Sequence, residues 1–387
     1  MRGAPSSRST RGRRALAIVL AAGASTVVAL LVAEVGVRAL APQSLILRRP
    51  DVWYPVQGLG WRRSPNLDTT VNFGGAGVVR LRTDADGNRV ATPARAGEAP
   101  PEVRVLAIGD SFVEALQVEY EDTMTARLED DLERTTGRPT EVQCAGVGGY
   151  NPNQYRLLAQ ERLERSRYDL LLVFLYVEND VVTKRVDSLP PRDPAPVHRL
   201  RLPRRLDGAE LRDALFYPVN DWLEVRSHAF VLAKRELDSL LARVGLTAKT
   251  MPFHIRKEDA ERPWWDVTAD VCAEIAQGAQ QRGVPTAFVL IPPAYAFLDE
   301  PLTELGYDPA TMDLLQPHRL LRDKLSARGL WIIDLLPAFQ RRFAEGVSCY
   351  GDVDSHLNRE GHRVAAAVIA PHVRARLVRE DARHATR

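Results

Sequence analysis

Residues 103–112 read VRVLAIGDSF, and this stretch decides the fold. Its first six residues are almost all apolar, as in a strand that is buried on both faces of a parallel sheet. The turn Gly109-Asp110-Ser111 then places a serine where the strand ends and a helix begins. Functional groups gather at this end of the strands in open parallel sheets. The stretch therefore predicts the first strand of an α/β domain, with Ser111 at its functional edge.

The same alternation of apolar runs and amphipathic helices continues toward the C-terminus. The next runs are MTARLEDDLERT (124–135), EVQCAGV (141–147), NQYRLLAQERLERS (153–166) and YDLLLVFLY (168–176). After an interruption at about 181–263 come DVCAEIAQGAQQRG (270–283), PTAFVLIPP (285–293), LLQPHRLLRDKLSARG (314–329), LWIIDLLP (330–337) and a final helix at about 358–379. Five strands alternating with helices predict a doubly wound, five-stranded parallel sheet of the flavodoxin-like, three-layer type. We expect the interruption to be a mostly helical insertion, positioned to cover the site.

The N-terminus carries a membrane signal. Residues 1–14 form a basic tail with five arginines and no acidic residue, and residues 15–33 are uncharged. As a helix, those 19 residues would span about 28 Å, close to the hydrocarbon thickness of a bilayer. We therefore expect a transmembrane helix at 15–37, with everything after residue 40 on the extracytoplasmic side because basic residues stay in the cytoplasm. A cleaved signal peptide remains the alternative.

The segment between this helix and the first strand differs in amino-acid composition. Residues 42–101 are rich in Pro, Gly, Asn and Asp, with short strand-like runs such as TTVNF and GVVRLRT. This composition predicts a linker and a small β cap.

Composition excludes several classes of protein. The chain is 387 residues long, 45% hydrophobic and 26% charged, which is globular, and its net charge of +2 gives no reason to expect nucleic acid as a partner. The cysteines are few and lie far apart without a CxxC motif, which excludes a disulfide scaffold and argues against structural zinc. In an oxidising compartment one pair, Cys144 and Cys349, remains open as a disulfide.

Three further loops bring chemistry to the carboxyl ends of the strands. CAGVGGYN (144–151) supplies a flexible glycine turn, VEND (177–180) supplies an asparagine, and GDVDSHLNREGH (351–362) places a histidine among acids before the last helix. A backbone N–H of the glycine turn and the Asn179 amide are candidates for an oxyanion hole. His356 is the candidate base for Ser111. Each feature alone is also ordinary loop or helix-cap chemistry.

Taken together and in this order, the four features resemble the SGNH hydrolase family, also called GDSL-like lipases and esterases. The resemblance covers roughly residues 103–375, within an expected domain at 102–380. It implies that Ser111 of GDSF is the nucleophile and that its backbone N–H is one oxyanion donor. It further implies that Gly149 and Asn179 complete the oxyanion hole and that His356 is the base.

The sequence departs from the family pattern at three positions. These are Val177, Cys144 and Val353, where a glycine, an asparagine and the triad acid are often found. The acid must then come from Asp354 or Asp352. In an extended loop alternate side chains share a face, which places both acids on the side of His356 and favours Asp354 as the nearer one. If the loop turns instead, Asp352 takes the role and Asp354 caps the helix.

The resemblance implies a serine esterase that forms an acyl-serine intermediate and needs no metal or organic cofactor. With the catalytic domain outside the membrane, we expect an acylated carbohydrate or a lipid ester as substrate. An O-acetyltransferase acting on an envelope or exported glycan is the alternative, and a non-catalytic glycan-binding or assembly protein on the same fold is the second. The pair Trp264-Trp265 is a weaker candidate for stacking on sugars, although packing is the commoner role.

Overall fold

The computed structural model describes residues 7–47, 49–73, 77–92, 100–194, 198–243, 254–297, 308–351 and 354–385. The chain forms two compact units. One unit combines Met1–Ile46 with Val197–Lys249, and the other combines Leu47–Pro196 with Thr250–Arg387. The flanks of the expected insertion at 181–263 therefore belong to the larger unit, as the bond from the Val182 backbone N–H to Thr268 Oγ1 (2.9 Å) illustrates.

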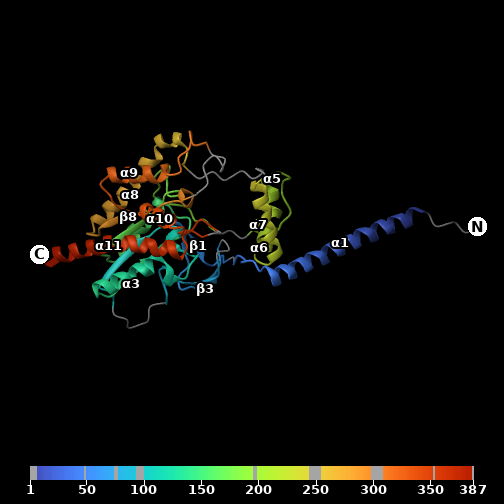
Figure 1. The fold of residues 1–387 in the computed structure, drawn as a ribbon, viewed down its shortest axis with the longest axis horizontal. Helices are drawn as coiled ribbons and strands as arrows, with labels where there is room; N and C mark the ends of the chain where they lie inside the picture. The colour runs from blue at the N-terminus through green and yellow to red at the C-terminus, as the bar shows by residue number, and fades with distance from the viewer. Residues whose placement is uncertain are drawn as a thin grey trace, which may run out of the picture. The chain divides into compact units, whose positions relative to one another are not determined.

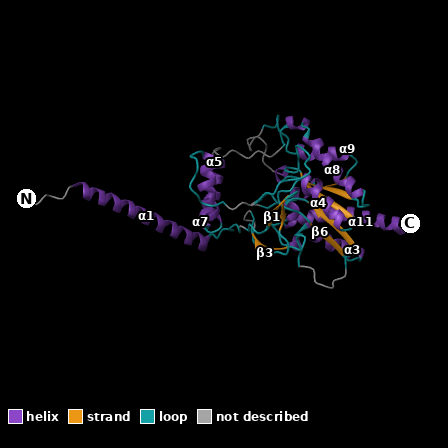
Figure 2. Cartoon of the chain, turned by 180° about the vertical axis from the view of Figure 1, so that it is seen from behind, coloured by secondary structure: helices purple, strands orange, loops and turns teal. Residues whose placement is uncertain are grey.

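The larger unit is built on a five-stranded parallel sheet (Figures 1 and 2). The strands are β5 (Val103–Ile108), β6 (Thr140–Cys144), β7 (Leu170–Tyr176), β8 (Thr286–Ile291) and β9 (Trp331–Asp334), in the order β6-β5-β7-β8-β9. Every residue of the central strand β7 is buried, which explains its continuous apolar sequence. The order reverses beside β5, which is the doubly wound topology expected from the sequence. The fold class is confirmed.

Helices cover both faces of this sheet and give it two hydrophobic cores. One core contains side chains of α3 (Met124–Thr136), α10 (Leu336–Ala344) and α11 (Arg359–Ala385). The other contains side chains of α4 (Pro152–Arg165), α8 (Trp264–Gln280) and α9 (Gln316–Ala327). Figure 1 shows α8 and α9 on the opposite side of the sheet from α3 and α11. The side chain of Trp265 is fully buried in the second core, so it packs the fold and does not face a sugar.

A pair of two-stranded antiparallel sheets precedes β5. Strand β1 (Trp53–Val56) pairs with β2 (Gly60–Arg63), and β3 (Asp68–Val71) pairs with β4 (Val79–Arg82). A small core of apolar side chains joins them to the segment after Ser111, namely Val52, Val71, Val79, Leu81 and Leu116. We call the described residues of 47–92 the β segment. Contacts place it in the same compact unit as the sheet.

The smaller unit contains the apolar N-terminal helix α1 (Ser7–Leu40) with α5 (Gly208–Leu211), α6 (Tyr217–Glu224) and α7 (His228–Arg243). Residues Leu16–Leu40 have a mean hydropathy of 2.5 and are long and apolar enough to cross a membrane, a property that signal sequences share. Near the end of α1, the Glu34 carboxylate accepts hydrogen bonds from Ser227 Oγ and from the backbone N–H groups of His228 and Ala229. Glu34 thereby satisfies the free N–H groups that begin α7.

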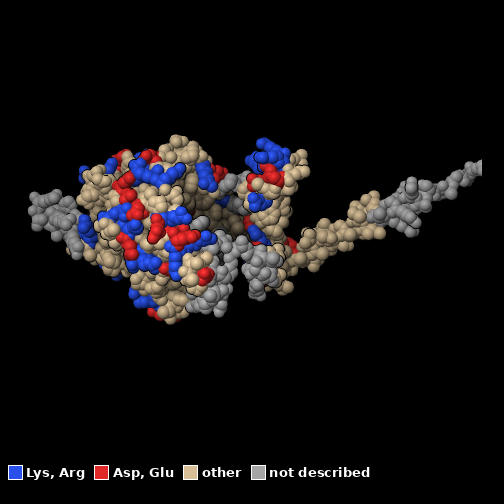
Figure 3. Space-filling model, turned by 90° about the horizontal axis from the view of Figure 1, so that it is seen from above, with Lys and Arg blue, Asp and Glu red and all other residues tan. Residues whose placement is uncertain are grey.

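Short irregular turns complete the described secondary structure. They are α2 (Ser111–Glu114), three 3₁₀ turns at Tyr120–Asp122, Lys257–Glu261 and Ala294–Phe297, and a π turn at Arg212–Phe216. All three cysteines are buried free thiols, so Cys144 and Cys349 do not pair. On the face that Figure 3 presents, Lys and Arg side chains are interspersed with Asp and Glu. This mixture agrees with the near-neutral net charge.

Candidate active site

Ser111 is the first residue of α2, directly after β5 and the Gly109-Asp110 turn. The buried Asp110 is the N-cap of α2, and its Oδ1 accepts a hydrogen bond from the Phe112 backbone N–H (2.9 Å). A Cβ at Gly109 would lie 2.4 Å from Cγ2 of Val113, so only glycine lets the helix turn this closely onto the strand. The turn leaves the Ser111 hydroxyl at the carboxyl edge of the sheet. The helix N-terminus next to it favours developing negative charge.

His356 lies in the loop before α11 and faces this serine. Its Nε2 is 2.8 Å from Ser111 Oγ, and its Nδ1 is 3.2 Å from Oδ2 of Asp354. The Nδ1 contact is an ion-pair distance without the straight alignment of a hydrogen bond, which is common in active sites without substrate. Asp354 Oδ1 also accepts the His356 backbone N–H (3.1 Å), and Gln117 Nε2 donates to Asp354 Oδ2 (3.2 Å). The structure thus brings Ser111, His356 and Asp354 into one row.

Asp352, the other acid that the sequence left open, lies outside the described residues. Of the two acids, the described residues include Asp354, whose carboxylate approaches the Nδ1 side of the His356 ring. A carboxylate on that side fixes the tautomer in which Nε2 accepts a proton.

The charges around His356 tune it for a base. Burial by itself lowers the pKa of the imidazole, but Asp354, together with the more distant Asp110 and Glu114, raises the pKa above its ordinary value. Burial likewise raises the pKa of Asp354, but the contact with His356 outweighs burial and holds this pKa below its ordinary value. Both shifts favour an ionised Asp354 beside a histidine that is ready to hold a proton.

The glycine turn after β6 forms the opposite wall. Gly149 has φ +77°, in the left-handed region that favours glycine, and lines the same cavity as Ser111 and His356. Among the residues that the structure describes, the Gly149 backbone N–H makes no hydrogen bond. It is therefore free to donate to an oxyanion. The preceding N–H, of Gly148, is bonded to Oε2 of Glu114 (2.9 Å).

Asn179 lies beside the nucleophile turn. Its Nδ2 donates to Asp110 Oδ2 (3.1 Å), and its side chain is exposed in the turn after β7. It is not among the residues that line the cavity. The structure therefore places Asn179 against the N-cap of the nucleophile turn, with one of its two amide hydrogens directed at Asp110. The neighbouring Asp180 is buried and accepts hydrogen bonds from the Tyr155 hydroxyl and the Tyr176 backbone N–H, which fixes the end of β7.

A cavity of about 440 Å³ opens at Ser111 and His356. Much of its wall comes from elements that the sequence did not connect with the site. These wall residues are Trp53, Trp61 and Phe73 of the β segment, Glu114, Leu116 and Gln117 after the nucleophile, and Arg192 and Pro194. The rings of Trp53 and Phe73 lie 5.1 Å apart, and Trp61 Nε1 donates to the Gly148 carbonyl (3.1 Å). The only signal in the sequence was the presence of aromatic residues in a segment expected to be a cap.

Among the described residues, no group of three or more His, Cys, Asp or Glu side chains is placed to hold a metal ion. A hydroxyl hydrogen-bonded to an imidazole, with a carboxylate at ion-pair distance from the other ring nitrogen and backbone donors nearby, can carry out nucleophilic acyl transfer.

Residues 255–387 match the family described as SGNH hydrolase-like domain, acetyltransferase AlgX. The match includes the segment with Asp354 and His356 and confirms the resemblance to the SGNH hydrolase family. No curated protein sequence matches the chain.

Several solved structures are similar over most of their length. They include TesA (12% identity, 70% of this chain and 99% of that one, TM-score 0.38) and the acetyl xylan esterase AlAXEase (15%, 70% and 100%, 0.38). A variant of the acetyl-xylooligosaccharide esterase Axe2 from Geobacillus is a third (12%, 70% and 94%, 0.37). These identities and TM-scores are too low to bear on the activity of this chain.

Proposed function

We propose, from the premise that this chain carries an SGNH hydrolase-like domain, that it is a serine esterase acting through an acyl-serine intermediate. The observation that carries the proposal is the row Ser111–His356–Asp354, with 2.8 Å between Ser111 Oγ and His356 Nε2 and 3.2 Å between His356 Nδ1 and Asp354 Oδ2. A non-catalytic binding protein would have no need to keep this row at the mouth of a cavity.

In the proposed reaction, Ser111 Oγ attacks the ester carbonyl while its proton passes to His356 Nε2. The negative charge on the carbonyl oxygen is stabilised by the backbone N–H groups of Ser111 and Gly149. When the intermediate collapses, the C–O bond to the alcohol breaks and His356 returns the proton to the leaving oxygen. Water, deprotonated by His356, then attacks the acyl-serine, and the acid is released as Ser111 recovers its proton. Asp354 holds the imidazole and stabilises its charged form.

The cavity supports a carbohydrate ester or a lipid ester as the substrate. Its wall is largely apolar, with Trp53, Trp61 and Phe73 contributing aromatic rings. Aromatic faces bind the apolar face of a sugar ring or an acyl chain, while Arg192 offers a polar partner at the same cavity.

A second candidate is transfer of the acyl group, acetyl in particular, to a hydroxyl of an envelope or exported glycan. The match of residues 255–387 to a family whose description names an acetyltransferase favours it. The two reactions share the acyl-serine and differ only in the acceptor that His356 deprotonates, which is water in one and an alcohol in the other.

The proposed location is the cell membrane, with α1 as a single anchor and the catalytic unit on the extracytoplasmic side. The basic start of the chain and the apolar segment Leu16–Leu40 support this topology.

The test is a comparison of the purified full-length protein with Ser111→Ala on short-chain and long-chain nitrophenyl esters and on acetylated glycans. We expect the variant to fold and to lose more than about 1000-fold in turnover, because removal of a triad nucleophile costs orders of magnitude. Ser326→Ala, on the exposed face of α9, is the matched control and should be unchanged. Retention of a tenth of wild-type turnover by Ser111→Ala would refute the serine mechanism. Adding a sugar alcohol and analysing the products by mass spectrometry separates transfer from hydrolysis.

A further inference from the structure

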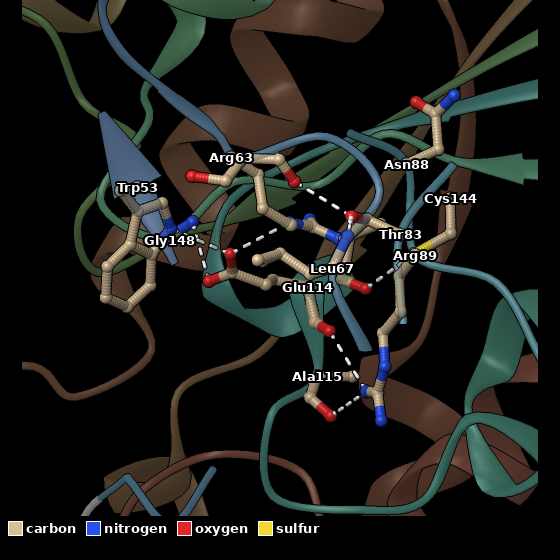
Figure 4. A network of polar contacts seen from close by, with 12 residues as sticks. Trp53, Arg63, Leu67, Thr83, Asn88, Arg89, Glu114, Ala115, Cys144 and Gly148 are labelled. Atoms are coloured by element: carbon tan, nitrogen blue, oxygen red, sulfur yellow. Dashed lines mark hydrogen bonds and ion pairs between the residues drawn. The ribbon is translucent and has the colours of Figure 1, made fainter. Parts of the chain in front are cut away.

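Glu114 is a buried carboxylate on α2 that the proposed reaction does not use. It lies three residues after Ser111, and only 1% of its surface is exposed. Its Oε1 accepts a hydrogen bond from Trp53 Nε1 (3.0 Å) and lies 3.2 Å from Nε of Arg63, while its Oε2 accepts the backbone N–H of Gly148 (2.9 Å). Figure 4 shows these contacts converging on Glu114 from the β segment and from the glycine turn.

The ion pair within this cluster is expensive to bury. The side chain of Arg63 is 1% exposed, and Glu114 is its ionic partner among the described residues. Removing two charges from water costs several kcal/mol per ion, on the order of what their attraction returns. A purely stabilising role would be met equally well by apolar side chains. We therefore ask which neighbouring group the Glu114–Arg63 ion pair holds in position.

What Glu114 positions is the peptide before Gly149. The N–H of Gly148 is held by Glu114 Oε2, and the carbonyl of the same residue accepts the indole N–H of Trp61 (3.1 Å). A Cβ at Gly148 would lie 2.7 Å from Glu114 Oε2, so a larger residue there would displace the Glu114 carboxylate. With both polar groups of Gly148 fixed, the next N–H, that of Gly149, is directed by the same contacts.

A second arginine of the β segment holds the other end of α2. Arg89 is fully buried, its Nη1 donates to the carbonyls of Glu114 (3.1 Å) and Ala115, and its Nη2 donates to the carbonyl of Val118 (2.7 Å). Ala115 has φ +55°, in the left-handed region, where α2 ends. Arg89 thus satisfies the last carbonyls of this short helix, and the backbone that carries Glu114 has little freedom to move.

We propose that Glu114 is a positioning residue that fixes the oxyanion donor Gly149 through Gly148, with Arg63 as the counter-charge that keeps its carboxylate in place. The inference rests on the proposed acyl-transfer function. It assigns the β segment a part in catalysis, because Arg63 and Trp61 come from that segment.

The test is steady-state kinetics of Glu114→Gln with a nitrophenyl ester. Both carboxylate oxygens face donors, so one end of the glutamine must present its NH₂ to a donor in either orientation. We expect kcat to fall about 10- to 100-fold, the range for a misplaced or weakened oxyanion donor. KM should stay within about twofold, because the Ser111–His356–Asp354 row is intact. The acid limb should move slightly to lower pH, because the Glu114 charge contributes to the raised pKa of His356. A purely structural defect would lower the active fraction or the melting temperature without this split.

Two further variants keep the test decisive if Glu114→Gln does not fold. Trp61→Phe removes the donor to the Gly148 carbonyl together with part of the cavity wall, and it leaves the ion pair in place. It should show the same loss in kcat, while the smaller ring affects KM. Arg63→Met combined with Glu114→Gln removes both charges of the ion pair, so neither is left without its partner, and we expect this variant to fold while kcat stays low. The matched control is Glu129→Gln on α3, another carboxylate that accepts a backbone N–H, from Val142 (2.7 Å), and it should have wild-type kcat.

The possible results distinguish a failure of the proposed function from a failure of the role of Glu114. If the wild-type protein is no more active than Ser111→Ala, the proposed function fails and this inference fails with it. If the wild type is active but folded Glu114→Gln, or Trp61→Phe in its place, keeps kcat within twofold, only the role of Glu114 is refuted. A rise in KM at constant kcat would also refute it, because it would assign Glu114 to supporting the Trp53 wall.

Discussion

Replacing Asp354 with asparagine tests the part of the site where the sequence departs from the family pattern. Asp354 holds His356 twice, through Oδ2 against the ring Nδ1 (3.2 Å) and through Oδ1 on its backbone N–H (3.1 Å). Asparagine keeps the size of the side chain and one acceptor oxygen but removes the charge. The fold of the loop should therefore survive, and the loss should fall on the chemistry of the ring.

The magnitude follows from the contact. Once bound substrate aligns the Nδ1–Oδ2 contact, a hydrogen bond to a charged group is worth about 1.5–3 kcal/mol, which corresponds to about 10- to 150-fold in rate. The Coulomb attraction of unit charges at 3.2 Å is about 5 kcal/mol at an effective dielectric of 20. The hydrogen-bond energy of about 1.5–3 kcal/mol is smaller than this attraction, so the charge of Asp354 can account for it. An asparagine NH₂ facing Nδ1 would also favour the tautomer in which Nε2 carries the proton and cannot accept one from Ser111. We therefore expect kcat to fall at least about 100-fold, with KM within about twofold.

The pH dependence gives an independent signature with a definite sign. His356 acts as a base only when it is neutral, so activity is lost as the pH falls through its pKa. The net effect of Asp354 is to raise this pKa above its ordinary value, so the wild-type acid limb should lie above about 6.5. Asparagine removes that effect, and the acid limb of the variant should move to lower pH.

The assay is the pH profile of kcat for nitrophenyl acetate hydrolysis. Asp334→Asn is the matched control, because Asp334 Oδ1 also contacts a histidine, Nε2 of the buried His318 (2.8 Å), away from the catalytic cavity. Near-wild-type kcat in Asp354→Asn would refute the assignment. If Asp352→Asn then carried the loss, Asp352 would be the acid, and if neither did, His356 would work with Ser111 as a dyad.

Two further predictions concern location and acid stability. Fusions of a compartment-sensitive reporter after residue 40 and at the C-terminus should both report export, and cytoplasmic activity of either would refute the proposed topology. Burial, with Arg89 and Arg127 as lesser causes, lowers the pKa of His362 to about 3, and its Nδ1 accepts the Met124 backbone N–H (3.3 Å). Between its unfolded pKa of about 6.5 and about 3, the unfolded chain binds a proton that the native chain does not. This histidine should then cost up to about 1.4 kcal/mol of stability per pH unit of acidification. Urea titrations from pH 7 to 4.5 should show that the free energy of unfolding falls less with acidification in His362→Gln than in the wild type. Equal slopes of unfolding free energy against pH would contradict the prediction.

The sheet was predictable because its pattern is local. Each strand from β5 to β9 is a short apolar run buried by helices on both faces, and the polar turns between them end each element sharply. The loops with Ser111, Gly149 and His356 were found for the same reason, since the carboxyl ends of parallel strands meet at one edge. A rule about alternate side chains in extended loops also favoured Asp354, and the structure places that carboxylate against the His356 ring.

The rest of the site depends on contacts that no local pattern encodes. Trp53 and Glu114 are 61 positions apart, and Trp61 and Gly148 are 87 apart, so their hydrogen bonds exist only once the β segment has packed on the sheet. The orientation of Asn179 is a similar case. Asparagine is the residue type expected in an oxyanion hole after a strand, but here its amide N–H donates to the buried Asp110 side chain.

The Asp110–Asn179 contact bears on how the oxyanion hole is divided. Burial raises the pKa of the Asp110 carboxyl, although its bonds from the Phe112 N–H and from Asn179 oppose this rise. A donor engaged with that group is worth less to a carbonyl oxygen than one whose N–H is unengaged. The Gly149 N–H is such a donor among the described residues, and its direction is set by Glu114 and Trp61 through Gly148. Stabilisation of the oxyanion should then rest more on the backbone of the glycine turn than on the asparagine, which makes the β segment as much a part of the catalytic machinery as the sheet.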